Sequence, residues 1–419
     1  MTILIRKAQI QDPASPFHLS VKDIFISNGI ISRIEDNINE ASDHIIEEEG
    51  LSVSPGWVDI FSHFCDPGYE HKESLETGAA AAASGGFTHV FLVPNTTPAI
   101  HSKSQVEYIV EKSRNLPACL HPIGAITKNV EGKELAEMYD MKLYDAMAFS
   151  DGLNAIQSAG LLIKALQYVK AINAVVIQLP DDKSIAPDGL MNEGIVSTRL
   201  GLPGKPAMAE EIMVARDIKL ARYTESRLHI TGISSAKSLE YIRRAKQGQI
   251  QVTCSITPYH MYFTDEDLVS YDTNLKVNLP LRTRKDADAL REAILDGTVD
   301  CVTSHHMPQE WDSKTCEFEY AKPGMIGLES CYGVLGALGI PQERINEVLS
   351  KNPREIFGLP ESSIKTGAKA DLTIFQPDVT YLFSTQLIKS KSKNSAFTGK
   401  TLKGKVIGTV SRDKLYLNA

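Results

Sequence analysis

The sequence lacks several features that would place this protein in a specialised class. No C-x-x-C pair occurs among its six cysteines, so neither a zinc knuckle nor a disulfide framework is expected. No segment approaches the roughly 18–20 consecutive apolar residues of a membrane span, and the first residues lack the apolar stretch of a secretion signal. Internal repeats and low-complexity tracts are also absent. We therefore expect a cytoplasmic protein without a membrane association, whose thiols are reduced and mostly buried.

The charge balance gives no indication of a nucleic-acid-binding protein. The chain has 44 Lys and Arg against 52 Asp and Glu, a formal net charge of −8, and these charges are spread along its length. Its hydrophobic content of 42% is ordinary for a globular protein. At 419 residues the chain is too long for one small domain, and it fits a large barrel with an accessory unit.

Strand patterns occupy both ends of the chain. They lie at residues 3–10, 23–35, 371–378 and 404–418. Asn28-Gly29 is typical of a hairpin turn between two strands, and Pro55-Gly56 separates the first segment from the middle of the chain. Two such segments can pair into one small domain. We predict a β-sandwich domain built from residues 1–54 and 356–419.

The middle of the chain alternates strand-like with helix-like segments. Short apolar runs lie at residues 89–95, 174–180, 228–234, 251–257 and 299–306. Helical patterns lie at residues 104–115, 161–172, 235–247 and 286–297. Such alternation indicates a parallel sheet with helical crossovers, and eight units of this kind close a barrel. The alternative is an open doubly wound sheet, but no glycine-rich phosphate loop follows the first strand. We predict an α/β fold with a (β/α)8 barrel over residues 55–355.

Polar residues with possible functions follow the ends of the apolar runs, where barrel active sites are assembled. These residues are His63, Asn95, Asp151, Gln178, His305 and His306. The two adjacent histidines near the last run face opposite sides of a strand, so they cannot both bind one metal ion.

Motifs along essentially the whole chain resemble, in order, those of dihydroorotase, the cyclic amidohydrolase of pyrimidine synthesis. They include PGWVDIFSHFCDPG, KESLETG, HVFLVPNTTP, NLKVNLPLR, DGTVDCVTSHHMPQ, PGMIGLES and NPREIFGLP. The resemblance implies a barrel with one or two Zn²⁺ ions at its mouth, which activate a hydroxide and polarise the ring carbonyl. It also implies an aspartate that moves the proton, and an arginine and an asparagine that hold the substrate.

The chain departs from this family pattern at most of these places. Phe61 stands where the first histidine of a His-x-His metal pair is expected, and His63 keeps the second. Cys65 replaces an arginine, which removes the cationic group for a substrate carboxylate. Asp151 remains from an Asp-Asp-Gly element. Gln178 and Gly232 replace two further histidines, while His305 and Gln309 replace the proton-shuttle aspartate and a substrate-facing histidine.

These replacements predict the loss of the inherited activity. With Phe61, Gln178 and Gly232 at three former ligand positions, His63 and Asp151 remain as the inherited metal ligands. A catalytic zinc ion typically keeps three protein ligands. Losing the proton-shuttle aspartate alone is expected to cost about 10²–10⁴-fold in rate. Asn95 and Asn278 then remain as vestigial substrate-binding residues. We expect no cofactor in this case.

A rebuilt metal site is the alternative. His63 and Cys65 share one face of their strand, so these two residues could converge with Asp151 and His305 on one zinc ion. The competing interpretation is a dry, metal-free mouth in which a cysteine and a histidine pack beside Phe61.

Two functions from different classes are consistent with these residues. Family members without the metal ligands are found assembled with aspartate carbamoyltransferase, so the resemblance implies a structural partner of that enzyme. A homodimer is also an expectation from the family. The other possibility is a working zinc-dependent cyclic amidohydrolase, either a dihydroorotase or a relative such as an allantoinase or hydantoinase, with a changed site.

Overall fold

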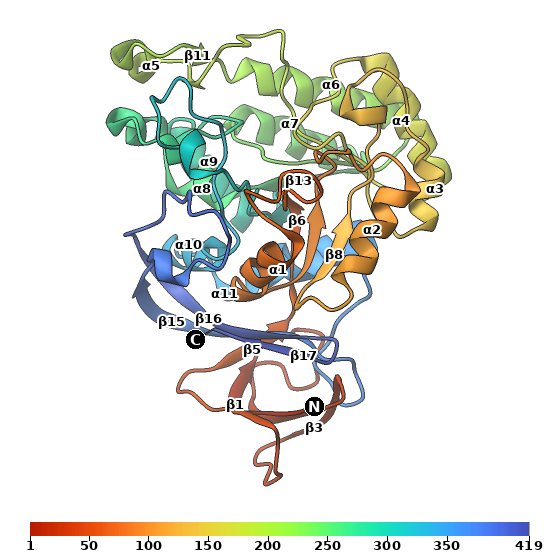
Figure 1. Cartoon of the computed structure of the whole chain (residues 1–419), viewed down its shortest axis with the longest axis vertical. Helices are drawn as coiled ribbons and strands as arrows, with labels where there is room; N and C mark the ends of the chain where they lie inside the picture. The colour runs from red at the N-terminus through yellow and green to blue at the C-terminus, as the bar shows by residue number, and fades with distance from the viewer. Residues whose placement is uncertain (419) are drawn as a thin grey trace.

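Strands from both ends of the chain form one sheet, which we call the terminal sheet domain; it lies below a barrel in Figure 1. The computed structural model describes residues 1–418. The strand order is β17-β16-β15-β5-β1-β2-β3, with β4 beside β1. The bounds are β1 (Thr2–Ile10), β2 (Val21–Ser27), β3 (Ile30–Glu35), β4 (His44–Ile46), β5 (Ser52–Pro55), β15 (Asp371–Leu382), β16 (Thr401–Ser411) and β17 (Lys414–Leu417). Because β5 pairs with both β1 and β15, it joins the two ends of the chain, as the sequence predicts.

The hairpin between β2 and β3 shows how local sequence sets this domain. Ser27 pairs with Ile30, so the turn has two residues, Asn28 and Gly29, with φ angles of 51° and 74°. Both angles suit a turn that matches the twist of a hairpin. A Cβ on Gly29 would lie 2.5 Å from the carbonyl oxygen of Arg412, so this position also requires glycine for space.

The barrel has eight strand positions, which confirms the predicted (β/α)8 architecture. Seven are strands: β6 (Trp57–Ser62), β7 (Phe87–Leu92), β8 (Cys119–Pro122), β9 (Val176–Gln178), β12 (Leu228–Ile230), β13 (Val252–Ile256) and β14 (Cys301–Val302). The remaining position is Phe149, which makes parallel bridges to Gly124 and Val176 and so connects the two barrel sheets. Asp59 closes the ring, because its Oδ2 accepts the backbone N–H of Ser304 at 2.6 Å.

Helices cover the outside of the barrel. They are α1 (Leu75–Ser84), α2 (Lys103–Ser113), α3 (Met138–Leu143), α4 (Ala159–Ala171), α5 (Ile195–Leu200), α6 (Met208–Thr224), α7 (Ala236–Gln247), α8 (Pro258–Tyr262), α9 (Arg284–Leu295), α10 (Cys331–Ala337), α11 (Gln342–Asn346) and α12 (Asn352–Phe357), with a π-helical turn η5 (Glu347–Lys351) before α12. Short 3-10 turns are η1 (Lys128–Val130), η2 (Asp265–Ser270), η3 (Thr273–Leu275), η4 (Trp311–Ser313) and η6 (Thr385–Leu387), and β10 (Met191–Asn192) pairs with β11 (Gly204–Lys205).

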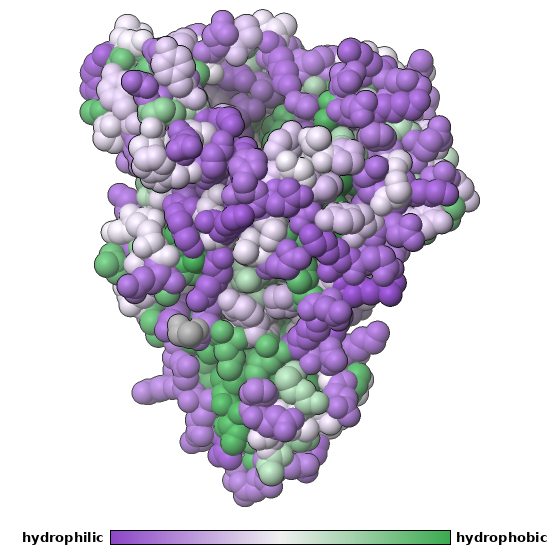
Figure 2. Space-filling model, in the orientation of Figure 1, coloured by the Kyte–Doolittle hydropathy of each residue, from purple (hydrophilic) through white to green (hydrophobic). Residues whose placement is uncertain are grey.

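The termini of these helices follow from local sequence. Ser74 caps α1 in a capping box with Thr77, and the helix stops at Gly85. Thr283 and Asp286 form the same arrangement at the start of α9. None of the helices in residues 1–418 combines the length and apolar character needed to cross a membrane. Figure 2 shows a mostly hydrophilic face over the barrel, with hydrophobic surface gathered over the terminal sheet domain.

A polar cluster connects the terminal sheet domain to the barrel. Asp371, on β15, accepts from Arg354 Nη2 at 2.6 Å and lies 3.1 Å from His89 Nε2, on β7. Burial alone would raise the pKa of Asp371, but His89 and Arg354 hold it well below its usual range. The carboxylate therefore stays charged and links both domains.

We expect Asp371→Asn to destabilise the protein by about 3 kcal/mol, because it leaves the buried Arg354 guanidinium without its charged partner. Urea unfolding at neutral pH measures this change. The matched control is Asp378→Asn on the same strand, where the side chain is 90% exposed and pairs only with Lys403. That change should stay within about 0.5 kcal/mol, and equal effects of the two variants would contradict the linking role of Asp371.

Candidate functional site

The candidate site lies at the C-terminal ends of the barrel strands, where β6, β9, β12 and β14 end close to His63, Gln178, Gly232 and His305. These positions come from distant parts of the chain, and the parallel sheet brings them to one edge of the barrel. All four are buried. The site therefore combines one kept histidine, His63, with three replaced positions at the end of the barrel where the sequence predicts them.

Three of the replaced positions pack against one another. The ring of Phe61 lies against the imidazole of His305, with centroids 4.5 Å apart and planes tilted by 31°. Gly232 has a φ angle of +74°, and a Cβ there would lie 2.7 Å from His305 Cε1. Position 232 therefore has no room for a side chain while His305 keeps this orientation. We call Phe61, Gly232 and His305 the mouth plug.

The imidazole of His305 is also held by a hydrogen bond. Its Nε2 lies 2.8 Å from Thr231 Oγ1, which in turn accepts from Ser255 Oγ at 2.8 Å. Burial lowers the pKa of His305 to about 3, so the ring is neutral at physiological pH. The neutral imidazole of His305 therefore cannot serve as the charged proton acceptor that the aspartate provides at this position in the family pattern.

His63 and Cys65 bond to each other. His63 Nε2 lies 3.0 Å from the carbonyl oxygen of Asn95, so this nitrogen carries the hydrogen and donates. The Nδ1 lone pair then faces Cys65 Sγ at 3.4 Å and accepts from the thiol. Burial lowers the pKa of His63 to about 4 and raises that of the Cys65 thiol. Since the thiolate is the form that binds metals, the buried thiol is a poor ligand.

Asp151 is bonded away from these residues. Its Oδ1 accepts the backbone N–H of Thr127 at 2.8 Å, and its Oδ2 accepts from the Thr127 hydroxyl. Burial raises the pKa of Asp151 to about 6 despite these bonds. Its carboxylate oxygens therefore hold the loop that begins near Thr127.

The two predicted substrate-binding asparagines are also bonded within the protein. Asn95 Nδ2 donates to the Asp151 carbonyl at 3.0 Å, and its Oδ1 accepts from Leu153 N at 2.9 Å. Asn278 Nδ2 donates to Asp181 Oδ2 at 3.2 Å. Both amides thus shape loops at the mouth.

An ion pair beside Asn278 carries no clear signal in the sequence. Lys205 Nζ lies 2.5 Å from Asp181 Oδ1 and 3.5 Å from Asn278 Oδ1, and both charged side chains are less than a tenth exposed. The lysine lies on β11, in a segment that sequence reasoning did not single out. Arg282 is bonded next to this pair, since its Nη1 donates to the Lys205 carbonyl at 2.8 Å and to Asn192 Oδ1 at 3.0 Å. Lys205 and Arg282 therefore belong to one internal network.

The residues present do not fit a catalytic zinc ion. Of the four candidates His63, Cys65, Asp151 and His305, the first two are within hydrogen-bonding distance of each other, while Asp151 and His305 bond to other groups. Within residues 1–418, no three His, Cys, Asp or Glu side chains lie close enough together to hold a metal ion. A tetrahedral site with an open position needs at least three such donors.

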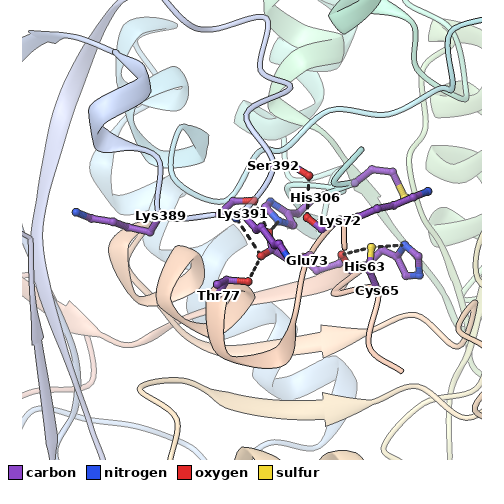
Figure 3. A network of polar contacts seen from close by, with 12 residues as sticks. His63, Cys65, Lys72, Glu73, Thr77, His306, Lys389, Lys391 and Ser392 are labelled. Carbon is purple, nitrogen blue, oxygen red and sulfur yellow. Dashed lines mark hydrogen bonds and ion pairs between the residues drawn. The ribbon is translucent and has the colours of Figure 1, made fainter. Parts of the chain in front are cut away.

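Glu73 is a buried glutamate beside the mouth, and nothing in the KESLETG segment that contains it predicts its role. Glu73 Oε2 lies 3.4 Å from His306 Nε2 and accepts from the Ser390 hydroxyl, and Oε1 accepts Lys391 N at 3.1 Å (Figure 3). His306 faces Glu73 while His305 faces Thr231. Both histidines lie beyond the end of β14 at Val302, and His305 has a φ angle of 43°, so strand alternation does not set their directions. Glu73 holds the segment before β16 against the loop after β14.

Comparison with known proteins gives consistent matches. The sequence profile of the Dihydro-orotase-like family matches residues 50–238. Three similar proteins named dihydroorotase come from Pelotomaculum thermopropionicum (40% identical, 96% of each chain covered), Syntrophus aciditrophicus (36%, 99% of each) and Acetivibrio thermocellus (39%, 99% of this chain and 100% of the relative).

Solved structures show the same fold at lower identity. The L-hydantoinase (dihydropyrimidinase) of Arthrobacter aurescens aligns with a TM-score of 0.86 at 20% identity, covering 99% of this chain and 96% of that chain. A D-hydantoinase aligns with a TM-score of 0.84 at 19% identity, covering 100% of this chain and 95% of the other. At this identity the likeness concerns the fold alone.

We expect Glu73→Gln to lower stability by about 3 kcal/mol at neutral pH, because the buried carboxylate anchors a long segment by several hydrogen bonds. Burial alone would raise the pKa of Glu73, but the bonds from His306 and Ser390 lower it below 4.5. The stabilisation is therefore present above pH 4.5 and is lost as pH falls through the lowered pKa. Thermal unfolding from pH 3 to pH 8 follows this loss, and Glu76→Gln on the exposed side of α1 is the control.

The mouth plug also predicts how a metal site could be restored. Phe61→His alone should not bind zinc, because the imidazole of His305 still fills the adjoining space. Combining Phe61→His with His305→Asp supplies two donors beside His63 and removes the ring, so zinc binding should increase by at least about tenfold. Calorimetric zinc titration measures both variants. Tight zinc binding by the unmutated chain would contradict a closed plug.

Proposed function

The chain belongs to the dihydroorotase family, and from this premise we propose that it is a non-catalytic member that acts as a structural partner of aspartate carbamoyltransferase. The proposed protein has no resident metal ion. Its barrel and terminal sheet domain provide a surface for assembly, and the assembly contains more than one copy of this chain, as a dimer or a larger oligomer.

The observation that carries the proposal is the mouth plug. Hydrolysis of a cyclic amide at neutral pH requires an activated water and a group that moves a proton to the leaving nitrogen. Phe61 and Gly232 have no side-chain atom that could bind a metal ion or a proton. His305 is neutral, packs against Phe61 and is hydrogen-bonded to Thr231. The carboxylate of Asp151 is bonded to Thr127. None of these groups is therefore free for either task.

The internal polar network supports the same proposal. A binding site keeps unpaired polar groups for its ligand, because those groups regain hydrogen bonds when the ligand arrives. Asn95 and Asn278 instead pair with the loops around them, and Lys205 pairs with Asp181. These side chains at the mouth are satisfied without a substrate.

The fold tolerates this loss because its stability does not depend on a metal. The barrel closes through Asp59, and the domains join through Asp371 and Arg354. All six cysteines are free, which suits the reducing cytoplasm where we place the protein. The outer surface can thus serve assembly while the mouth is inactive.

A second candidate is a zinc-dependent cyclic amidohydrolase with a rebuilt site. The observation in its favour is the contact between His63 and Cys65, two potential zinc ligands 3.4 Å apart. In this candidate His63 Nδ1 would bind the zinc ion while Nε2 keeps its bond to Asn95, and the candidate requires ionisation of the Cys65 thiol and a third donor.

One pair of measurements separates the candidates. Dihydroorotate turnover is assayed with and without added Zn²⁺, with the dihydroorotase of Pelotomaculum thermopropionicum as the active control. We expect no turnover above background from this chain, and co-elution with the aspartate carbamoyltransferase of the same organism in size-exclusion chromatography. Zinc-dependent turnover abolished by His63→Ala would establish the second candidate instead. Absence of both turnover and co-elution would remove the partner role.

A further inference from the structure

Two largely exposed aromatic side chains lie on the loop after β14. Trp311 is 74% exposed and Tyr320 is 75% exposed, whereas Trp57, the other tryptophan of the chain, is fully buried. Aromatic rings usually bury most of their surface, and Trp and Tyr are among the residue types that contribute most strongly to protein interfaces. Two exposed rings on one loop therefore indicate a contact surface.

Backbone hydrogen bonds close this loop at its base and within it. Met307 N donates to the Met325 carbonyl at 2.8 Å, and Lys322 N donates to the Ser313 carbonyl at 3.1 Å. The segment that carries both rings is therefore folded back on itself and held at both ends.

The inner side of the loop is anchored to the segment around η3. Lys314 Nζ donates to the Thr273 carbonyl at 2.9 Å, and the Thr273 hydroxyl donates to the Lys314 carbonyl at 2.6 Å. Lys276 Nζ donates to the carbonyls of Phe318 and Glu319 at 2.8 and 2.9 Å. Because the loop is fixed from the inside, its exposed rings lose little conformational freedom when a partner docks on them.

The exposed charges beside the rings are negative. Asp312, Glu317 and Glu319 are exposed, and none of these carboxylates forms an ion pair with any residue of 1–418. The remaining acidic side chain of the loop, that of Glu310, is paired with Lys322 at 3.0 Å. We call the two rings and the three unpaired carboxylates the aromatic platform.

The chemistry of the aromatic platform fits a basic occupant. The faces of Trp and Tyr rings attract cations, and the planar guanidinium of arginine stacks on them. The carboxylates attract the same cations and repel the phosphates of nucleic acids and anionic lipids. An uncharged apolar partner would bury the carboxylates without partners, which costs free energy.

We propose that the aromatic platform is a docking surface for a basic segment of a partner protein. Arginine side chains of that segment stack on Trp311 and Tyr320 and pair with the neighbouring carboxylates. This inference goes beyond the proposed function, because it concerns the chemistry of the docked segment and not the identity of the partner.

The aromatic platform lies beside the barrel mouth. Lys72, on the loop after β6, donates from Nζ to Gln309 Oε1 at 3.1 Å and pairs with Glu310 at 3.4 Å. Gln309 and Glu310 directly precede Trp311 in the chain. A docked segment therefore contacts the molecule at the C-terminal end of the barrel, next to the loop that carries Glu73.

The test titrates the full-length protein with a labelled peptide of alternating Arg and Ser and measures its affinity by fluorescence anisotropy. We expect saturable binding that the double variant Trp311→Ala with Tyr320→Ala weakens by at least about tenfold. The matched control is Tyr223→Ala on α6, where the side chain is 73% exposed and lies outside the platform. That variant should bind like the unmutated protein.

Tryptophan emission locates the bound peptide. Since Trp57 is fully buried, a change in emission on titration reports on Trp311. We expect this change with the Arg-Ser peptide and a weaker affinity for a Lys-Ser peptide, because lysine does not stack on a ring as arginine does. Equal affinity for the two peptides would contradict stacking on the rings.

A charge-matched pair of variants tests the carboxylates. Asp312→Asn combined with Glu319→Gln should weaken binding and reduce its dependence on salt. Glu48→Gln combined with Glu49→Gln removes the same charge from an exposed segment of the terminal sheet domain and should leave the affinity unchanged. Equal effects of the two double variants would show attraction to the net charge of the protein and would contradict a local docking surface.

Three further results would overturn the proposal. They are the absence of peptide binding by the unmutated protein, unchanged affinity in the double variant of the rings, and binding without a change in tryptophan emission. The peptide titration contains no carbamoyltransferase, so its outcome is independent of the partner proposed above.

Discussion

The imidazole of His305 packs between the ring of Phe61 and the backbone of Gly232, and the state of the whole barrel mouth depends on this contact. While the ring is there, position 232 has no space for a side chain. Burial keeps the ring neutral, and Thr231 holds it by a hydrogen bond. The three replacements are therefore physically coupled, and reversing one of them leaves the other two in place.

The polar groups around this contact are satisfied by the protein itself. His63 donates to Asn95, Cys65 donates to His63, and Asp151 accepts from Thr127. Such pairing favours a rigid, closed structure over a site that awaits a ligand, because each group would have to lose a bond before it gained another. The barrel and the terminal sheet domain do not need a metal ion for their structure, because the contacts of Asp59, Asp371 and Glu73 hold them together.

Much of the fold was predictable from the sequence, because its signals are local. The alternation of strands and helices and the Asn28-Gly29 turn follow from backbone periodicity and turn chemistry. The replaced family residues were also predicted at the right edge of the barrel. The hydrogen-bond partners of these replaced residues were not predictable, because a hydrogen bond depends on the orientation of two groups in three dimensions.

Specific residues show where sequence reasoning ended. The spacing predicts His63 and Cys65 on one strand face, but β6 ends at Ser62 and Cys65 has a φ angle of 62°, so the two residues lie in the loop after the strand. There the two side chains bond to each other, and His63 also bonds to Asn95. Lys205 carried no signal at all, because a lysine is normally exposed. Its burial against Asp181 becomes visible only when these two residues, which lie on separate segments, are seen side by side.

The most direct measurement of the closed mouth is ¹⁵N NMR of the histidine rings during a zinc titration of the unmutated protein. The structure predicts neutral rings for His63 and His305 at pH 7, with Nε2 of His63 protonated, and no change in either ring as zinc is added. A stoichiometric shift of the Nδ1 resonance of His63, or of a ring nitrogen of His305, would show that the mouth binds metal and would contradict a closed, metal-free mouth.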